Sequence, residues 1–192
     1  MPQINLLRTL LRTTLAITTS LSVVAARDAN LLPTVCVTGA TGYLASELTA
    51  QLLSTGRYMV RGTVRSLANE EKLAPLRTLS GAAERLELME ADLFDAGSFE
   101  PCIAGVMFVF HTASPFITSN IVDPMTQLVE PAVKGTEAVL AAAALAGVTR
   151  VVLTSSIAAV KGAAPKADGS CFSEDDWNES STLDGDGLDQ YR

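Results

Sequence analysis

Histidine is almost absent from this sequence, and cysteine is scarce. Among the 192 residues there are one histidine, His111, and three cysteines, Cys36, Cys102 and Cys171. A lone histidine removes most zinc sites and most histidine-dependent catalytic triads from consideration. Three cysteines far apart in the chain form neither a disulfide framework nor a zinc knuckle. We therefore expect no metal site.

Positive charge is also in short supply. The sequence has 14 lysines and arginines against 21 aspartates and glutamates, a formal net charge of -7 and an isoelectric point near 4.7. Nucleic-acid-binding proteins need a clustered basic surface, and the densest basic run here is Arg57, Arg61 and Arg65. Nucleic acid is therefore not an expected partner. The composition leaves the oligomeric state open.

Long hydrophobic runs are missing as well, although the N-terminal segment is weakly apolar. Residues 1–27 contain three arginines and many serines and threonines, and no acidic residue precedes Asp28. This composition is typical of a mitochondrial transit segment, and residues 15–26 also resemble the apolar core of a secretory signal. The same residues are too few and too polar to span a membrane.

We expect residues 1–32 to be such a leader, or else a disordered extension of the kind that a misplaced start codon adds. A working transit segment would make the protein mitochondrial, and without one we expect it to be cytoplasmic. Residues 33–192 are expected to form one partial NADP-binding domain.

Short apolar, β-branched runs alternate with helical periodicity after Pro33. Continuously apolar strands alternating with helices predict an α/β fold with a parallel sheet covered on both faces. Right-handed crossovers then give a doubly wound Rossmann sheet in the order 3-2-1-4-5, with its ligand at the carboxyl ends of strands one and four. Strands are expected at 34–38, 58–64, 86–89, 106–110 and 151–155, and helices at 43–54, 69–79, 98–103 and about 124–146, the last interrupted near Pro131.

The clearest motif joins the first predicted strand to the first predicted helix. Gly39 permits a tight turn, and Gly42 lets the backbone approach a pyrophosphate at the helix N-terminus. Ala45 is small enough for the helix to pack closely on the strand. The pattern is Gly-x-x-Gly-x-x-Ala, and its strand–turn–helix context favours a dinucleotide site over an ordinary turn. The predicted cofactor-binding segment is Gly39, Ala40, Thr41, Gly42, Tyr43, Leu44 and Ala45.

The end of the second predicted strand indicates which cofactor is bound. Sites that prefer NAD usually carry an acidic residue about 20 residues beyond the glycines, where it binds the ribose 2′-hydroxyl. This sequence has Arg65 near that place. A guanidinium suits the 2′-phosphate of NADP(H) through paired hydrogen bonds. Lys72, in the next predicted helix, is a second candidate; the alternative is that both are solvated surface charges.

Seven short motifs follow one another along the chain. They are VTGATGYLA at 37–45, VRGTVR at 60–65, ADL at 91–93, VFHTASP at 109–115, VKGT at 133–136, RVVLTSS at 150–156 and EDDW at 174–177. In these motifs, their order and their spacing, the chain resembles the dihydroflavonol-4-reductase and cinnamoyl-CoA reductase group. That group belongs to the extended short-chain dehydrogenases of the NAD-dependent epimerase/dehydratase superfamily. The resemblance covers the chain from about residue 33 onward.

The resemblance implies roles on the cofactor side of the site. Asp92 and Leu93, after the third strand, would flank the adenine. The residues after the fourth strand would line the path to the nicotinamide, and His111 beside them would be structural, packed below the site. These nicotinamide-side residues are Thr112, Ala113 and Ser114.

The resemblance also implies the catalytic pair. Ser156 matches the family's catalytic serine, whose hydroxyl can hydrogen-bond a carbonyl as it becomes an alkoxide. The family's proton donor is a tyrosine four residues before a lysine, and Tyr191 falls where that motif begins. The matching lysine position lies beyond Arg192, so the sequence does not contain it.

These features predict an NADP(H)-dependent oxidoreductase that reduces a ketone, aldehyde or acyl-thioester carbonyl of a small molecule. The family's later strands and smaller substrate domain have no counterpart in the sequence, so we expect an incomplete sheet and a fragment of such an enzyme. Two alternatives stay open. One is a sugar-nucleotide epimerase or dehydratase, and the other is a non-catalytic NADP(H)-binding sensor or pseudoenzyme, which the missing lysine favours.

Overall fold

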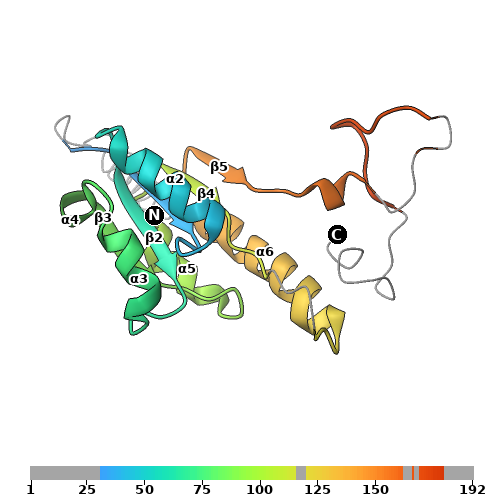
Figure 1. Ribbon diagram of the computed structural model, residues 1–192, viewed down its shortest axis with the longest axis horizontal. Coiled ribbons are helices and arrows are strands. Elements are labelled where there is room, and N and C mark those ends of the chain that lie inside the picture. The colour runs from blue at the N-terminus through green and yellow to red at the C-terminus, as the bar shows by residue number, and fades with distance from the viewer. Residues whose placement is uncertain (1–30, 116–119, 162–165, 167–168, 180–192) are drawn as a thin grey trace, which may run out of the picture. The chain divides into compact units, whose positions relative to one another are not determined.

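A computed structural model describes residues 31–115, 120–161, 166 and 169–179 (Figure 1). The chain divides into two units, Met1–Leu32 and Pro33–Arg192. Almost all of the first unit lies outside the described residues, and so does the predicted catalytic Tyr191. The second unit holds every strand that the structure describes.

Five parallel strands form one sheet in the order β3-β2-β1-β4-β5, which is the doubly wound order predicted from the sequence. The central strands β1 and β4 pair so that Thr38 lies opposite His111, and both strands end there. This is the point where the strand order reverses and where doubly wound folds bind their ligands. The strands are β1 (Thr34–Thr38), β2 (Met59–Val64), β3 (Leu86–Glu90), β4 (Phe108–His111) and β5 (Arg150–Leu153).

Helices connect the strands and cover both faces of the sheet (Figure 1). The helices are α2 (Tyr43–Ser54), α3 (Glu70–Arg77), α4 (Ala82–Arg85), α5 (Phe99–Ile103) and α6 (Glu130–Leu145), with the 3-10 turns η1 (Ala96–Ser98) and η3 (Ile157–Ala159) and the π-helical turn η2 (Met125–Val129). In the described part of the chain, no helix is long and apolar enough to cross a lipid bilayer.

Alternation along β1 divides the core into two layers. Val35 and Val37 point to one face and pack with Leu53 of α2, whereas Cys36 points to the other face and packs with Val139 of α6. Burial raises the pKa of the Cys36 thiol to about 12, so the thiol stays protonated. Cys36 therefore serves as apolar filling between the sheet and the helices behind it.

The long helix predicted at 124–146 is divided near Pro131, as the sequence indicated. A π-helical turn covers Met125–Val129, and regular α-helix begins at Glu130. Pro131 has no N–H group and cannot donate to the carbonyl of Gln127 four residues earlier. The π geometry itself was not predicted. At the other end, Gly147 has a φ of 65° and terminates α6.

Two strand ends differ from the prediction by two residues, and one short helix was not predicted. β4 begins at Phe108 rather than at 106, because the Val106 N–H bonds to the Ile103 carbonyl (3.2 Å) and so belongs to the turn that ends α5. β5 ends at Leu153, two residues earlier than predicted. The short helix α4 was not predicted, since four residues carry too little periodicity to be recognised.

Candidate functional site

The glycine turn between β1 and α2 opens the site. Gly39 has a φ of 68°, and the Gly42 N–H closes the turn on the Gly39 carbonyl at 2.8 Å. Gly42 is the N-cap of α2 and makes no side-chain cap hydrogen bond, so the first N–H groups of the helix remain available to an anion. Tyr43 is 98% exposed beside the turn, while Ala45 is buried against the sheet.

Two residues of β2, Thr63 and Gly62, allow this turn to be held close to the strand, and neither role was predicted from the sequence. The Thr63 hydroxyl accepts from the Gly39 N–H at 3.0 Å, and the Thr63 carbonyl accepts from the Ala40 N–H at 2.8 Å. A Cβ on Gly62 would lie 2.8 Å from the Cβ of Ala40. A glycine is therefore needed at 62 for the turn to lie this close to β2.

The loop after β2 carries Arg65, which is exposed. The Leu67 N–H in this loop donates to the Glu90 carboxylate at 2.6 Å, so the end of β3 fixes the loop. Asn69 caps α3 by accepting from the Lys72 N–H at 3.2 Å.

Lys72 lies on the first turn of α3 and helps to line a cavity of about 260 Å³ between α2 and α3. Thr41 of the glycine turn and Ser46 of α2 line the same cavity. Lys72 of α3 and Thr41 of the glycine turn therefore face the same cavity.

Asp92 and Leu93 follow β3 at the same edge of the sheet. One carboxylate oxygen of Asp92 accepts from the Phe94 N–H at 3.0 Å, and the Asp92 N–H donates to the Ser98 hydroxyl at 3.0 Å. Leu93 packs on Gly135 of α6, where an added Cβ would come within 3.0 Å of the Leu93 Cβ. Leu93 thus anchors the loop after β3 to α6 at a position where an added side chain would displace it.

The loop after β4 is tied to the end of β1. The Thr38 hydroxyl accepts from the N–H groups of both Thr112 and Ala113, each at 3.0 Å. The Thr112 hydroxyl donates in turn to the Thr38 carbonyl. Ala113 lies against Gly39, since a Cβ there would be 3.2 Å from the Ala113 Cα. Ser114, the next residue, is exposed.

His111 lies beneath this loop and is 2% exposed. Its Nδ1 lies 2.8 Å from the Thr38 hydroxyl, and its Nε2 lies 3.3 Å from the Thr136 hydroxyl of α6. Burial lowers the pKa of His111 to about 4, so the imidazole is neutral at physiological pH.

Acidification is expected to reduce stability through His111. Its pKa of about 4 in the folded protein lies below its usual 6.5, so the unfolded chain binds a proton that the folded chain excludes. The stabilisation that comes from excluding this proton is complete above the unfolded pKa of 6.5. It is lost progressively as the pH falls from there through the folded pKa of about 4. Between pH 7.5 and pH 5 the loss should be about 2 kcal/mol.

Urea unfolding at pH 7.5 and pH 5 measures this loss. The His111→Asn variant is the reference, because its carboxylates titrate as before while the imidazole is gone. An equal loss of stability in both proteins would show that His111 does not contribute.

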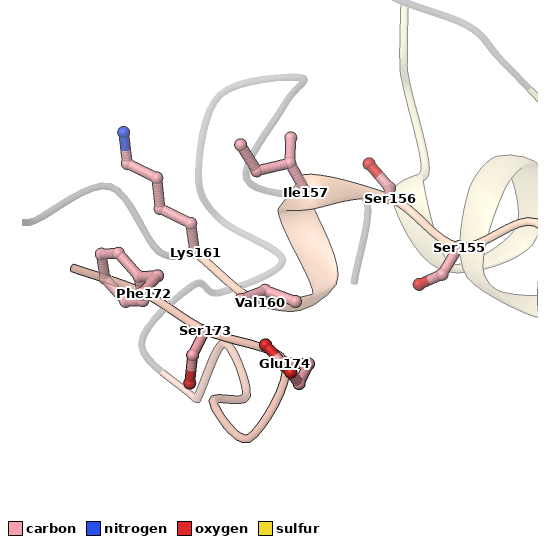
Figure 2. Close-up of a pocket in the computed structure, with 8 residues that line it drawn as sticks. All are labelled: Ser155, Ser156, Ile157, Val160, Lys161, Phe172, Ser173 and Glu174. Atoms are coloured by element: carbon pink, nitrogen blue, oxygen red, sulfur yellow. The ribbon is translucent and has the colours of Figure 1, made fainter.

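Ser156 lies just beyond β5 and is the N-cap of η3, accepting from the Ala158 N–H at 3.2 Å. Ser155 and Ser156 are both exposed, and Figure 2 shows their hydroxyls pointing in opposite directions. Both serines line an open cavity of about 510 Å³. The other lining residues are Ile157, Val160, Lys161, Phe172, Ser173 and Glu174.

The segment with the EDDW motif packs back onto η3. The Asn178 backbone N–H donates to the Ala159 carbonyl at 2.9 Å, and the Asn178 side-chain amide donates to the Ala158 carbonyl at 2.8 Å. Ile157, Val160 and Phe172 contribute apolar side chains to the lining of the cavity (Figure 2). No group of three or more histidine, cysteine or acidic side chains in the described residues could hold a metal ion.

Comparison with known proteins agrees with this geometry. A family model described as NAD(P)H-binding matches residues 39–181. The chain belongs to this NAD(P)H-binding family. It is 48% identical over 134 residues to a cinnamoyl-CoA reductase from Medicago truncatula, a match that covers 69% of this chain and 40% of that protein. It is 41% identical over 153 residues to dihydroflavonol 4-reductase from Hordeum vulgare, covering 79% of this chain and 42% of that protein.

Solved structures are similar as well. The crystal structure of Gre2 from Candida albicans in complex with NADPH matches with a TM-score of 0.70 and 35% identity, over 83% of this chain and 48% of that one. The predicted fold and the resemblance to the dihydroflavonol-4-reductase and cinnamoyl-CoA reductase group are therefore confirmed. The chain spans about two fifths of the length of the curated relatives it matches. The roles of the individual site residues remain predictions.

Proposed function

We propose that the protein to which this chain belongs is an NADP(H)-dependent reductase acting on a small-molecule ketone, aldehyde or acyl-thioester carbonyl. The observation that carries this proposal is the position of Ser156. It follows β5 and lines an open cavity, and β5 pairs with β4, whose own following loop is tied to Thr38 at the end of β1, directly before the glycine turn. The Ser156 hydroxyl and the glycine turn thus follow two strands, β5 and β1, that β4 alone separates, and both lie at the carboxyl-terminal edge of the sheet.

The chain's own residues would divide the work. The first turn of α2 would bind the pyrophosphate, and Arg65, with Lys72 nearby on α3, would bind the 2′-phosphate. Bound NADPH would supply the hydride that reduces the carbonyl carbon. Ser156 would hydrogen-bond the carbonyl oxygen as negative charge develops on it, and Tyr191 would give that oxygen its proton.

The proposal is tested by two measurements that separate it from its alternatives. The 192-residue chain is titrated with NADPH, and a longer protein containing the chain is assayed for NADPH oxidation with aldehydes, ketones and acyl thioesters. We expect binding in the first and turnover in the second. Binding without turnover would favour a sensor, and conversion of sugar nucleotides without net NADPH oxidation would favour an epimerase or dehydratase.

A further inference from the structure

We propose that His111 is a positioning residue, which orients the Thr38 hydroxyl so that the loop after β4 is held in the shape that receives the nicotinamide half of the cofactor. In this role His111 neither donates nor accepts a proton during the reaction. This inference rests on the proposed function, because it assumes that the nicotinamide half of NADP(H) binds beside the loop after β4.

The hydrogen bonds around Thr38 determine where its proton goes. A threonine hydroxyl has two acceptor lone pairs and one proton to donate. Both lone pairs are used, because the N–H groups of Thr112 and Ala113 each donate to this oxygen at 3.0 Å. The proton therefore has to point at the remaining neighbour, the Nδ1 atom of His111 at 2.8 Å.

This assignment fixes the tautomer of His111. An Nδ1 that accepts a hydrogen bond carries no proton, so the proton of the neutral ring is on Nε2. Nε2 then donates to the Thr136 hydroxyl of α6, 3.3 Å away. An imidazole with its proton on Nδ1 would instead aim an N–H at an oxygen that already accepts two.

The ring is held from both sides, which makes it a rigid spacer. Thr38 ends β1 directly opposite His111, and Thr136 belongs to the helix behind the sheet. Both Thr38 and His111 are almost fully buried, so the hydrogen bond between them is shielded from solvent. Removing the acceptor at Nδ1 would free the Thr38 hydroxyl to rotate, and the two loop N–H groups would lose a fixed partner.

The first test needs no substitution. Because the chain contains one histidine, its imidazole nitrogens give one pair of ¹⁵N resonances in a selectively labelled sample. We expect Nδ1 to resonate as an unprotonated nitrogen and Nε2 as a protonated one at pH 7. The reverse pattern, or an averaged pair of shifts from a mixture of tautomers, would overturn the proposal.

The second test compares two substitutions at the same site. The side-chain oxygen of asparagine can take the place of Nδ1, whereas the longer glutamine places its amide near Nε2. We expect His111→Gln to weaken NADPH binding roughly five- to tenfold, the effect of about one lost hydrogen bond, and His111→Asn to restore most of it. Equal affinities in the two variants would contradict the role of an acceptor at this position.

A third comparison separates positioning from general loosening of the fold. Adenosine 2′,5′-bisphosphate carries the adenine end of the cofactor without the nicotinamide, and its affinity should change less than about twofold in His111→Gln. Thr38→Val removes the shared hydroxyl and should weaken NADPH binding at least as much as His111→Gln does. Thr49→Val is the matched control, because Thr49 is equally buried and its hydroxyl has no hydrogen-bond partner among the residues that the structure describes.

The outcomes also distinguish this inference from the proposed function. Failure of the unaltered chain to bind NADPH would overturn the proposed function and with it the positioning role. Normal NADPH binding in Thr38→Val and His111→Gln would overturn the positioning role alone. Parallel losses for NADPH and the bisphosphate would show that His111 only stabilises the fold.

Discussion

In a longer protein that contains this chain, Ser156→Ala is expected to lower kcat roughly 100- to 1000-fold, the usual cost of losing a donor to a developing oxyanion. The Kd for NADPH should stay nearly unchanged, because the serine hydroxyl acts on charge that appears only in the transition state. Steady-state kinetics and a fluorescence titration measure the two quantities. A loss confined to KM would mean that Ser156 binds the substrate without acting in the chemical step.

Two neighbouring substitutions make this result specific. Ser155→Ala changes the same kind of side chain one position earlier, and its hydroxyl points in the opposite direction (Figure 2). We expect Ser155→Ala to leave most of kcat intact. Ser156 also caps η3, so Ser156→Thr, which keeps a hydroxyl able to cap and to donate, should retain measurably more activity than Ser156→Ala. Equal kcat in the threonine and alanine variants would argue against a catalytic hydroxyl.

The local parts of the fold could be predicted from the sequence. β1 and α2 have the bounds that were expected, Thr34–Thr38 and Tyr43–Ser54. A β-branched run ends at a glycine turn, and the helical stretch ends just before Gly56, which has a φ of 67°. The sheet order followed from the alternation of strands and helices and the handedness of their connections. These features depend on residues close together in the chain.

The supports of the site could not be predicted in the same way, because they join residues far apart in the chain. Thr63 holds the glycine turn from 24 positions away, and Thr38 holds the loop after β4 from 74 and 75 positions away. A sequence shows which residue types are buried on a face, but it does not show which hydroxyl meets which N–H group. His111 was expected to be structural, and its two threonine partners became visible only in three dimensions.

Arg65→Ala is expected to weaken NADPH binding by about 1.5–3 kcal/mol and NADH binding by very little. Arg65 is exposed after β2, and among the described residues it has no ion-pair partner that would have to be given up for a phosphate. The hydrogen bond from Leu67 to Glu90 holds its loop against β3, so the guanidinium needs little further ordering to bind. The affinity ratio of the two cofactors in the variant measures the effect.

Arg57→Ala is the matched control for this prediction. Arg57 is also an exposed arginine next to β2, but it precedes Met59 and therefore lies at the opposite end of the strand. Its removal lowers the net charge by the same amount while leaving the proposed 2′-phosphate site untouched, so both cofactors should lose affinity only slightly and equally. High salt should weaken NADPH binding more in the unaltered protein than in Arg65→Ala. Salt screens the attraction between the Arg65 guanidinium and the 2′-phosphate, and the variant lacks that attraction. If Arg65→Ala weakened NADPH and NADH to the same degree, Arg65 would be a general surface charge, and the preference for NADP(H) would have to come from other residues such as Lys72.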